Sequence, residues 1–142
     1  MNDGGLLCAS CMENIQFDLL MGNVDVNMGS ILESVFAQNL RSNGFELHYY
    51  DSKKIGELDF ILQKGLSTEL LEIKSGNDFK KHSAMDRALK VDNWKFDKSI
   101  VFSKSNIQKE ENILYLPWYM IMFFRQEKMP EKMIYQIDIG DL

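Results

Sequence analysis

The sequence predicts an α/β fold in which a mixed central β-sheet is flanked by α-helices. Some segments repeat apolar residues at a helical period, and several short segments alternate apolar with polar residues as half-buried strands do. The predicted order is helix, strand, two-stranded hairpin, helix, strand, strand, helix, which places both neighbouring and distant strands in one sheet. A chain of 142 residues has the length of one domain, so we expect residues 1–142 to form a single domain.

The first regular helix is predicted at residues 30–41, after a helical and loop extension over residues 1–29. Its apolar side chains fall on one arc at about 100° per residue, and Asn43 and Gly44 then supply the residue types that end helices. Glu33 lies at the edge of this arc and has two interpretations. Ser30 and Glu33 have the spacing of a capping box, but the same position lets Glu33 point toward a functional site.

A strand is predicted at residues 45–50, followed by a turn into an antiparallel hairpin of residues 57–62 and 70–74. Side chains alternate between the two faces of a strand. Glu57 and Asp59 are therefore expected on one face of the hairpin, with Leu58, Phe60 and Leu62 on the other. In the second strand Glu72 and Lys74 share a face, with Leu71 and Ile73 behind them.

A second helix is predicted at residues 79–91, with Asn77 or Asp78 as its N-cap. It carries the densest positive charge of the chain, including Lys80, Lys81 and Arg87. Such charges usually only solvate a helix face. The alternative is that they contact the phosphates of a nucleic acid beside the acidic hairpin.

The last part of the chain is predicted to hold strands at 99–103 and 112–116, a helix at 117–124 and an edge strand at 135–139. Pro117 is expected at the first position of this helix, which is apolar nearly all round and so belongs to a core or an interface. Near the start of the chain, Cys8 and Cys11 form a CxxC pair without a second pair at zinc-finger spacing. We expect two buried or half-buried thiols there, and a redox role is a weaker alternative.

The hairpin gathers three carboxylates and a lysine on one surface. Like charges at close range repel each other, and a divalent cation removes that repulsion by taking carboxylate oxygens as ligands. A lysine two residues from a metal-binding glutamate can hold a substrate phosphate or orient a water molecule. Together these groups suit the metal-assisted attack of water on a phosphodiester.

The spacing of these residues resembles the PD-(D/E)XK nuclease motif. Asp59 is followed thirteen positions later by Glu72, one spacer and Lys74, with Leu58 in place of the proline of the signature. The wider pattern is similar to an uncharacterised domain found after the ATPase module of prokaryotic AAA-family ATPases. Its matching segments cover most of the chain and lie at residues 3–7, 32–35, 56–60, 72–76 and 115–120.

The resemblance implies a restriction-endonuclease-like core and a nuclease that acts on DNA with Mg²⁺ or Mn²⁺. Asp59 and Glu72 would be the metal ligands, with the carbonyl of Ile73 as a third, and Lys74 would act on the scissile phosphate or the water. Glu33 would join the catalytic acids and Glu57 would support them. The alternative is a non-catalytic interaction domain that binds an ATPase module or another partner protein, with residues 118–124 as the docking surface.

Charge and hydropathy set further expectations. The net charge of −5 counts against tight, nonspecific binding to nucleic acid, but a local basic strip can coexist with a negative total. No apolar run is long enough for a membrane span, the first residues lack the pattern of a signal peptide, and no Walker A motif is present. We therefore expect a cytoplasmic protein without an ATPase module in this chain. The oligomeric state is left open, with a homo-oligomer among the alternatives.

Overall fold

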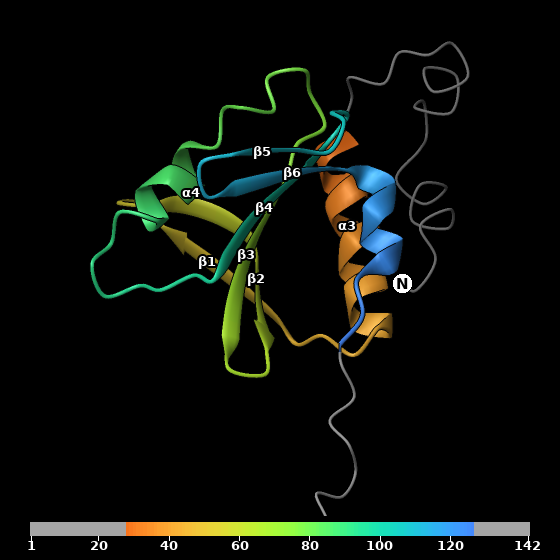
Figure 1. The fold of residues 1–142 in the computed structure, drawn as a ribbon, viewed down its shortest axis with the longest axis horizontal. Helices are drawn as coiled ribbons and strands as arrows, with labels where there is room; N and C mark the ends of the chain where they lie inside the picture. The colour runs from red at the N-terminus through yellow and green to blue at the C-terminus, as the bar shows by residue number, and fades with distance from the viewer. Residues whose placement is uncertain (1–27, 127–142) are drawn as a thin grey trace, which may run out of the picture.

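The structure is a computed structural model that describes residues 28–126 (Figure 1). The predictions for residues 1–27, which include Cys8 and Cys11, and for the strand at 135–139 lie outside the described residues. None of the described helices has the length and apolar character needed to cross a membrane.

The described chain forms a six-stranded mixed sheet with helices on both faces, so the predicted α/β class is confirmed. The strand order is β1-β2-β3-β4-β6-β5. Antiparallel pairs join β1 to β2, β2 to β3 and β5 to β6, whereas β3, β4 and β6 run parallel. The elements are α3 (Met28–Ser42), β1 (Leu47–Ser52), β2 (Gly56–Lys64), β3 (Ser67–Ile73), α4 (Ser83–Ala88), β4 (Lys98–Ser103), β5 (Gln108–Glu110), β6 (Ile113–Pro117) and the 3-10 helix η1 (Trp118–Phe123).

Two hydrophobic clusters pack on the two faces of the sheet. Helices α3 and η1 cover one face and α4 covers the other (Figure 1). On the α3 side, the ring of Phe36 meets that of Phe102 edge to face, with centroids 4.9 Å apart. On the α4 side, Met85 and Ala88 pack fully buried against strand residues that include Leu58, Leu70 and Val101. The sheet is therefore anchored from both sides.

Helix α3 differs from its predicted form at its start and agrees at its end. The chain is already helical at Met28, so Ser30 lies inside the helix and the predicted capping box with Glu33 is wrong. At the other end the amide of Phe45 donates to the carbonyl of Leu40 at 3.1 Å, and Gly44 has a φ of 86°. This is the left-handed glycine that commonly follows a helix, as predicted.

The predicted hairpin is confirmed, but its first strand does not alternate regularly. Phe60 and Leu62 pack in the α3-side cluster, whereas Leu58 packs in the α4-side cluster. The pairing shows why: His48 is opposite Ile61, and two residues later Tyr50 is opposite Leu58. Between these two pairs β2 advances by three residues while β1 advances by two, so β2 contains a β-bulge. Asp59 lies within this bulge.

Helix α4 is much shorter than the predicted helix at 79–91, and its N-cap is His82 instead of Asn77 or Asp78. The His82 ring is held in place by tertiary contacts. Its Nδ1 lies 2.8 Å from Asp86 Oδ1, and its Nε2 lies 2.8 Å from the hydroxyl of Tyr115 on β6. The contact with Tyr115 joins the start of the helix to β6, and nothing in the local sequence indicates it.

The C-terminal elements also depart from expectation. Strand β5 was not predicted. The final helix is a 3-10 helix that begins at Trp118. Pro117 is the last residue of β6 and the N-cap of this helix, and it is not the first helical residue as predicted. The described residues cover only one face of η1. Ile121 is buried, whereas Tyr119, Met122 and Phe123 are more than half exposed.

Candidate acidic site

The predicted acidic residues meet where β2 begins and β3 ends. These two strands are antiparallel, so the start of β2 lies beside the carboxyl end of β3. Asp59 lies in the bulge of β2, and Glu72 is the second-last residue of β3. The first turn of α3 lies against the same end, because a Cβ on Gly29 would be 3.9 Å from Ser75 Oγ.

Asp59 is held by the backbone of the neighbouring strand. The amide of Ile73 donates a hydrogen bond of 2.6 Å to Asp59 Oδ2. Burial raises the pKa of Asp59 from 3.8 to about 7, and the nearby Glu72 carboxylate adds to the rise. The Ile73 hydrogen bond and the Lys74 charge oppose this pKa shift without cancelling it. Asp59 is therefore close to half protonated at neutral pH.

Glu72 is a buried carboxylate with only one satisfied oxygen. Its Oε1 lies 2.6 Å from Lys74 Nζ, whereas its Oε2 is buried and has no hydrogen-bond partner among residues 28–126. The residue is only 4% exposed. Leaving a buried carboxylate oxygen without a donor or a cation costs free energy. Glu72 is therefore an acceptor whose second oxygen is available to a further ligand.

Glu33 joins the same cluster from α3, and Glu57 lies at its edge. Burial is the largest cause that raises the pKa of Glu33. The negative charges of Glu57 and Glu72 raise this pKa further, and the positive charge of Lys74 lowers it. Glu57 itself is exposed. The structure thus brings Glu33, Asp59, Glu72 and Lys74 into one electrostatically coupled group, which was the sequence-based expectation.

The donor set suits a divalent cation only in part. Among residues 28–126, no group of three or more His, Cys, Asp or Glu side chains is arranged to hold a metal ion. Two carboxylates are nevertheless enough for Mg²⁺, which usually keeps several waters and takes one or two carboxylates together with substrate phosphates. The free oxygen of Glu72 and the carboxylate of Asp59 fit that arrangement.

The predicted phosphate contacts divide into two groups. Lys80 pairs with Glu110, and Lys81 pairs with Asp78 at 2.8 Å, so acids outside the acidic site neutralise both. Arg87 pairs with no acid of the described residues. Its Nε donates to the carbonyl of Ile55 at 2.8 Å, which places it next to the start of β2.

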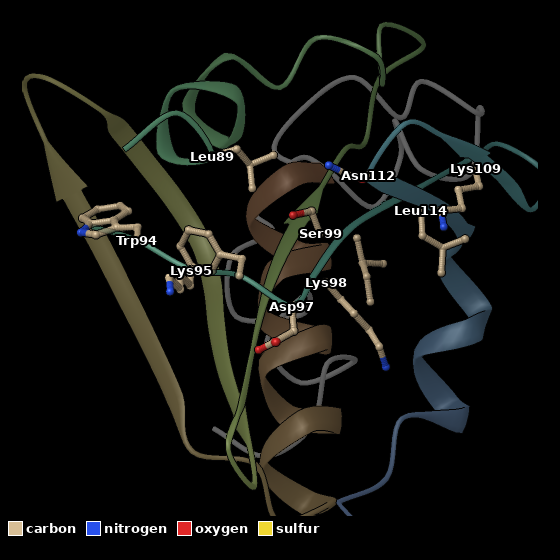
Figure 2. A pocket seen from close by; sticks show the side chains of 11 residues that line it. Leu89, Trp94, Lys95, Asp97, Lys98, Ser99, Lys109, Asn112 and Leu114 are labelled. Atoms are coloured by element: carbon tan, nitrogen blue, oxygen red, sulfur yellow. The ribbon is translucent and has the colours of Figure 1, made fainter. Parts of the chain in front are cut away.

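A large hollow lies at the opposite end of the sheet (Figure 2). Its volume is about 750 Å³, and it lies beside the starts of β4 and β6. Its lining includes Trp94, Lys95, Lys98, Lys109 and Asn112. Lys98 Nζ lies 3.2 Å from the buried carboxylate of Glu69. The sequence analysis did not single out this hollow, although the Trp-Lys-Phe run at residues 94–96 was a visible signal.

A comparison with known protein families identifies the family of this chain. The family described as Domain of unknown function (DUF4143) matches residues 28–121, about two thirds of the chain. The chain belongs to this family. DUF4143 is a domain found at the C-terminus of AAA-ATPase-like proteins, which agrees with the predicted resemblance to a domain that follows an ATPase module. No curated protein and no solved structure matches the chain.

Proposed function

We propose that this DUF4143 domain is a divalent-metal-dependent, nuclease-like domain that hydrolyses phosphodiesters in DNA, as the C-terminal part or a relative of an AAA-family ATPase. The observation that carries the proposal is the state of Glu72. It is buried, one oxygen is 2.6 Å from Lys74 Nζ, and the other has no hydrogen-bond partner within the described part of the chain. A buried acid is rarely left half satisfied without a functional reason.

The arrangement of strands supports a restriction-endonuclease-like core as part of the same proposal. An antiparallel hairpin, β2 and β3, supplies Asp59 and Glu72, and the parallel strands β4 and β6 continue the sheet from β3. The acids therefore stand on rigid strands and not on loops, which favours a fixed geometry for catalysis.

Each residue of the acidic site has a distinct task in this proposal. Asp59 and Glu72 would hold Mg²⁺ or Mn²⁺, with the carbonyl of Ile73 as a third ligand. Such an ion, when bound, stabilises charge on a phosphoryl oxygen and makes water more acidic. Lys74 directs its ammonium group toward the scissile phosphate or the attacking water. Glu33 adds negative charge at the α3 side of the site, and Glu57 supports it from the exposed edge.

Cleavage of labelled single- and double-stranded DNA in Mn²⁺ tests this function. We expect cleavage by the wild type and a loss of at least about a hundredfold in Asp59→Asn and Glu72→Gln, since each removes a charged ligand. Glu46→Gln is the control, because Glu46 is an exposed acid outside the site. Absence of cleavage by the wild type, or cleavage that survives Asp59→Asn, would refute the enzymatic proposal.

A non-catalytic interaction domain is the second candidate, and the surface of η1 favours it. Tyr119, Met122 and Phe123 expose large apolar side chains on one short segment, and such patches mark protein interfaces. In this case the domain would bind an ATPase module through η1. Tyr119→Ser with Phe123→Ser would then abolish co-elution with that module, and Asp59→Asn would leave it intact.

A further inference from the structure

A second hollow, just before the start of β2, is lined by three cations. It has a volume of about 420 Å³ and lies between the turn that follows β1 and the end of α4. Lys54, Arg87 and Lys90 line it, together with one acid, Asp92. No ion pair neutralises these three cations within the part of the chain that the structure describes. In a chain with a net charge of −5, such a local excess of positive charge indicates an anionic ligand.

The guanidinium of Arg87 is held in a fixed position in this hollow. Its Nε donates to the carbonyl of Ile55 at 2.8 Å. The neighbouring residue, Gly56, has a φ of 95°, and a Cβ there would lie 3.0 Å from Arg87 Nη2 and 3.3 Å from the Cβ of Ala84. Glycine therefore permits this close approach of α4 to β2. The remaining N–H groups of the guanidinium stay available as a pre-organised fork for phosphate oxygens.

The position of the hollow relates it to the acidic site. Gly56 begins β2, and Asp59 follows three residues later on the same strand. At a rise of about 3.3 Å per residue, the two positions are roughly 10 Å apart. Successive phosphates of one strand rise by about 3.4 Å along the helix axis of B-form DNA but lie further apart through space, because the strand also winds around that axis. This separation therefore corresponds to about one to two nucleotides.

We infer that the hollow lined by Lys54, Arg87 and Lys90 is a phosphate subsite for a nucleic acid strand. It holds a backbone phosphate about one to two nucleotides from the phosphodiester at Asp59, Glu72 and Lys74. The choice of a nucleic acid as the ligand rests on the proposed function. Arg87 supplies the fixed fork, and the two exposed lysines neutralise the phosphate charge.

The larger hollow of Figure 2 is a matched comparison for this subsite. It also carries three cations, all of them lysines, and one acid, but it lies at the far end of the sheet from Asp59 and Glu72. Two of its lysines, Lys95 and Lys109, are exposed like Lys54 and Lys90. Removing either pair changes the net charge of the protein by the same amount, so long-range electrostatics are matched and only the location differs.

Fluorescence anisotropy of a labelled oligonucleotide in EDTA tests the subsite, because binding is then measured without cleavage. We expect Lys54→Ala with Lys90→Ala to weaken binding at least tenfold. The slope of log K against log salt should shrink by about 1.4 to 1.8, as for two lost phosphate contacts. Lys95→Ala with Lys109→Ala should change the affinity less than twofold. Arg87→Lys, which keeps the charge but loses the fork, should weaken binding several-fold.

Three results would overturn the subsite: no binding of the oligonucleotide by the wild type, equal losses in the two double variants, or displacement of the strand by micromolar inorganic phosphate. The last would mark a site for a free anion. The cleavage assay separates this inference from the proposed function. If Lys54→Ala with Lys90→Ala cleaves with an unchanged KM, the function stands and the subsite is refuted. If the strand binds through this hollow but is not cleaved in Mn²⁺, the subsite stands and the hydrolytic function is refuted.

Discussion

The amide of Ile73 donates a hydrogen bond of 2.6 Å to the carboxylate of Asp59, and this contact joins the bulge of β2 to the end of β3. The bulge adds one residue to β2 and so changes the side of the sheet on which the following side chains lie. Asp59 is thereby directed to the backbone beside Glu72 instead of outward to solvent. The place of Asp59 in the acidic group follows from this contact, whereas its high pKa follows from burial, which the Ile73 hydrogen bond opposes.

Metal-free stability should depend on the ionisation of Asp59. The pKa of its carboxyl is about 7 in the folded protein, compared with 3.8 as the ordinary value. Between these values the folded state binds a proton that the unfolded state has released, so stability should fall as pH rises from about 4 to 7. A shift of this size corresponds to a loss on the order of 4 kcal/mol above pH 7.

Urea unfolding of Asp59→Asn in EDTA checks this expectation. The amide oxygen can still accept from Ile73, but it carries no charge. The variant should therefore be more stable than the wild type at pH 8, with little difference near pH 4. Glu46→Gln, at an exposed acid, should follow the wild type at both pH values. An equal pH dependence for the wild type and Asp59→Asn would contradict the assignment.

The effects of substituting Glu72 and Lys74 on the free energy of unfolding should not be additive, because the two side chains form an ion pair. Lys74→Met leaves the buried Glu72 carboxylate without its cation, which costs 3–5 kcal/mol for fully buried pairs. Because Lys74 is partly exposed, we expect a smaller loss of about 1–3 kcal/mol. Adding Glu72→Gln should recover most of it. A double-mutant cycle by denaturant unfolding measures this coupling, and additive single effects would show that the pair is not energetically linked.

The turn between β2 and β3 offers a test that is independent of the acidic site. Gly65 has a φ of 63° and no atom within 4 Å of an added Cβ, so Gly65→Ala introduces backbone strain without a clash. We expect a loss of about 1–2 kcal/mol. Gly76 is equally open but has no positive φ of this kind, so Gly76→Ala should be neutral or stabilise by about 0.4–1 kcal/mol. Thermal unfolding compares the two, and equal effects would contradict the turn conformation.

Local sequence patterns predicted the central elements well. The period-two alternation over residues 57–62 and 70–74 identified the hairpin, and Asn43 with Gly44 identified the end of α3. The acidic group could also be predicted, because Glu72 and Lys74 need only strand periodicity to lie on one face. The bulge could not, since the side of the sheet taken by Leu58 depends on its pairing with Tyr50 of another strand.

Other features depended on contacts distant in sequence. The start of α4 follows from the His82 contact with Tyr115, 33 positions away. Strand β5 consists of polar residues only and forms by pairing with β6. The two strands are joined by a tight turn in which Glu111 takes a φ of 51°, where glycine would be expected. The cationic hollow likewise combines Lys54 with Arg87 and Lys90, which are remote from it in sequence.

The melting temperature with and without Mn²⁺ tests the acidic site as a metal site most directly. With about 10 mM Mn²⁺ and a Kd on the order of 1 mM, binding to the folded state stabilises it by roughly 1.4 kcal/mol. We expect the melting temperature of the wild type to rise by about 2–4 °C or slightly more. The rise should disappear in Asp59→Asn and in Glu72→Gln, and it should persist in Glu46→Gln and Lys74→Met. A wild type that melts at the same temperature with and without Mn²⁺, or an equal rise in Asp59→Asn, would contradict a metal site at Asp59 and Glu72.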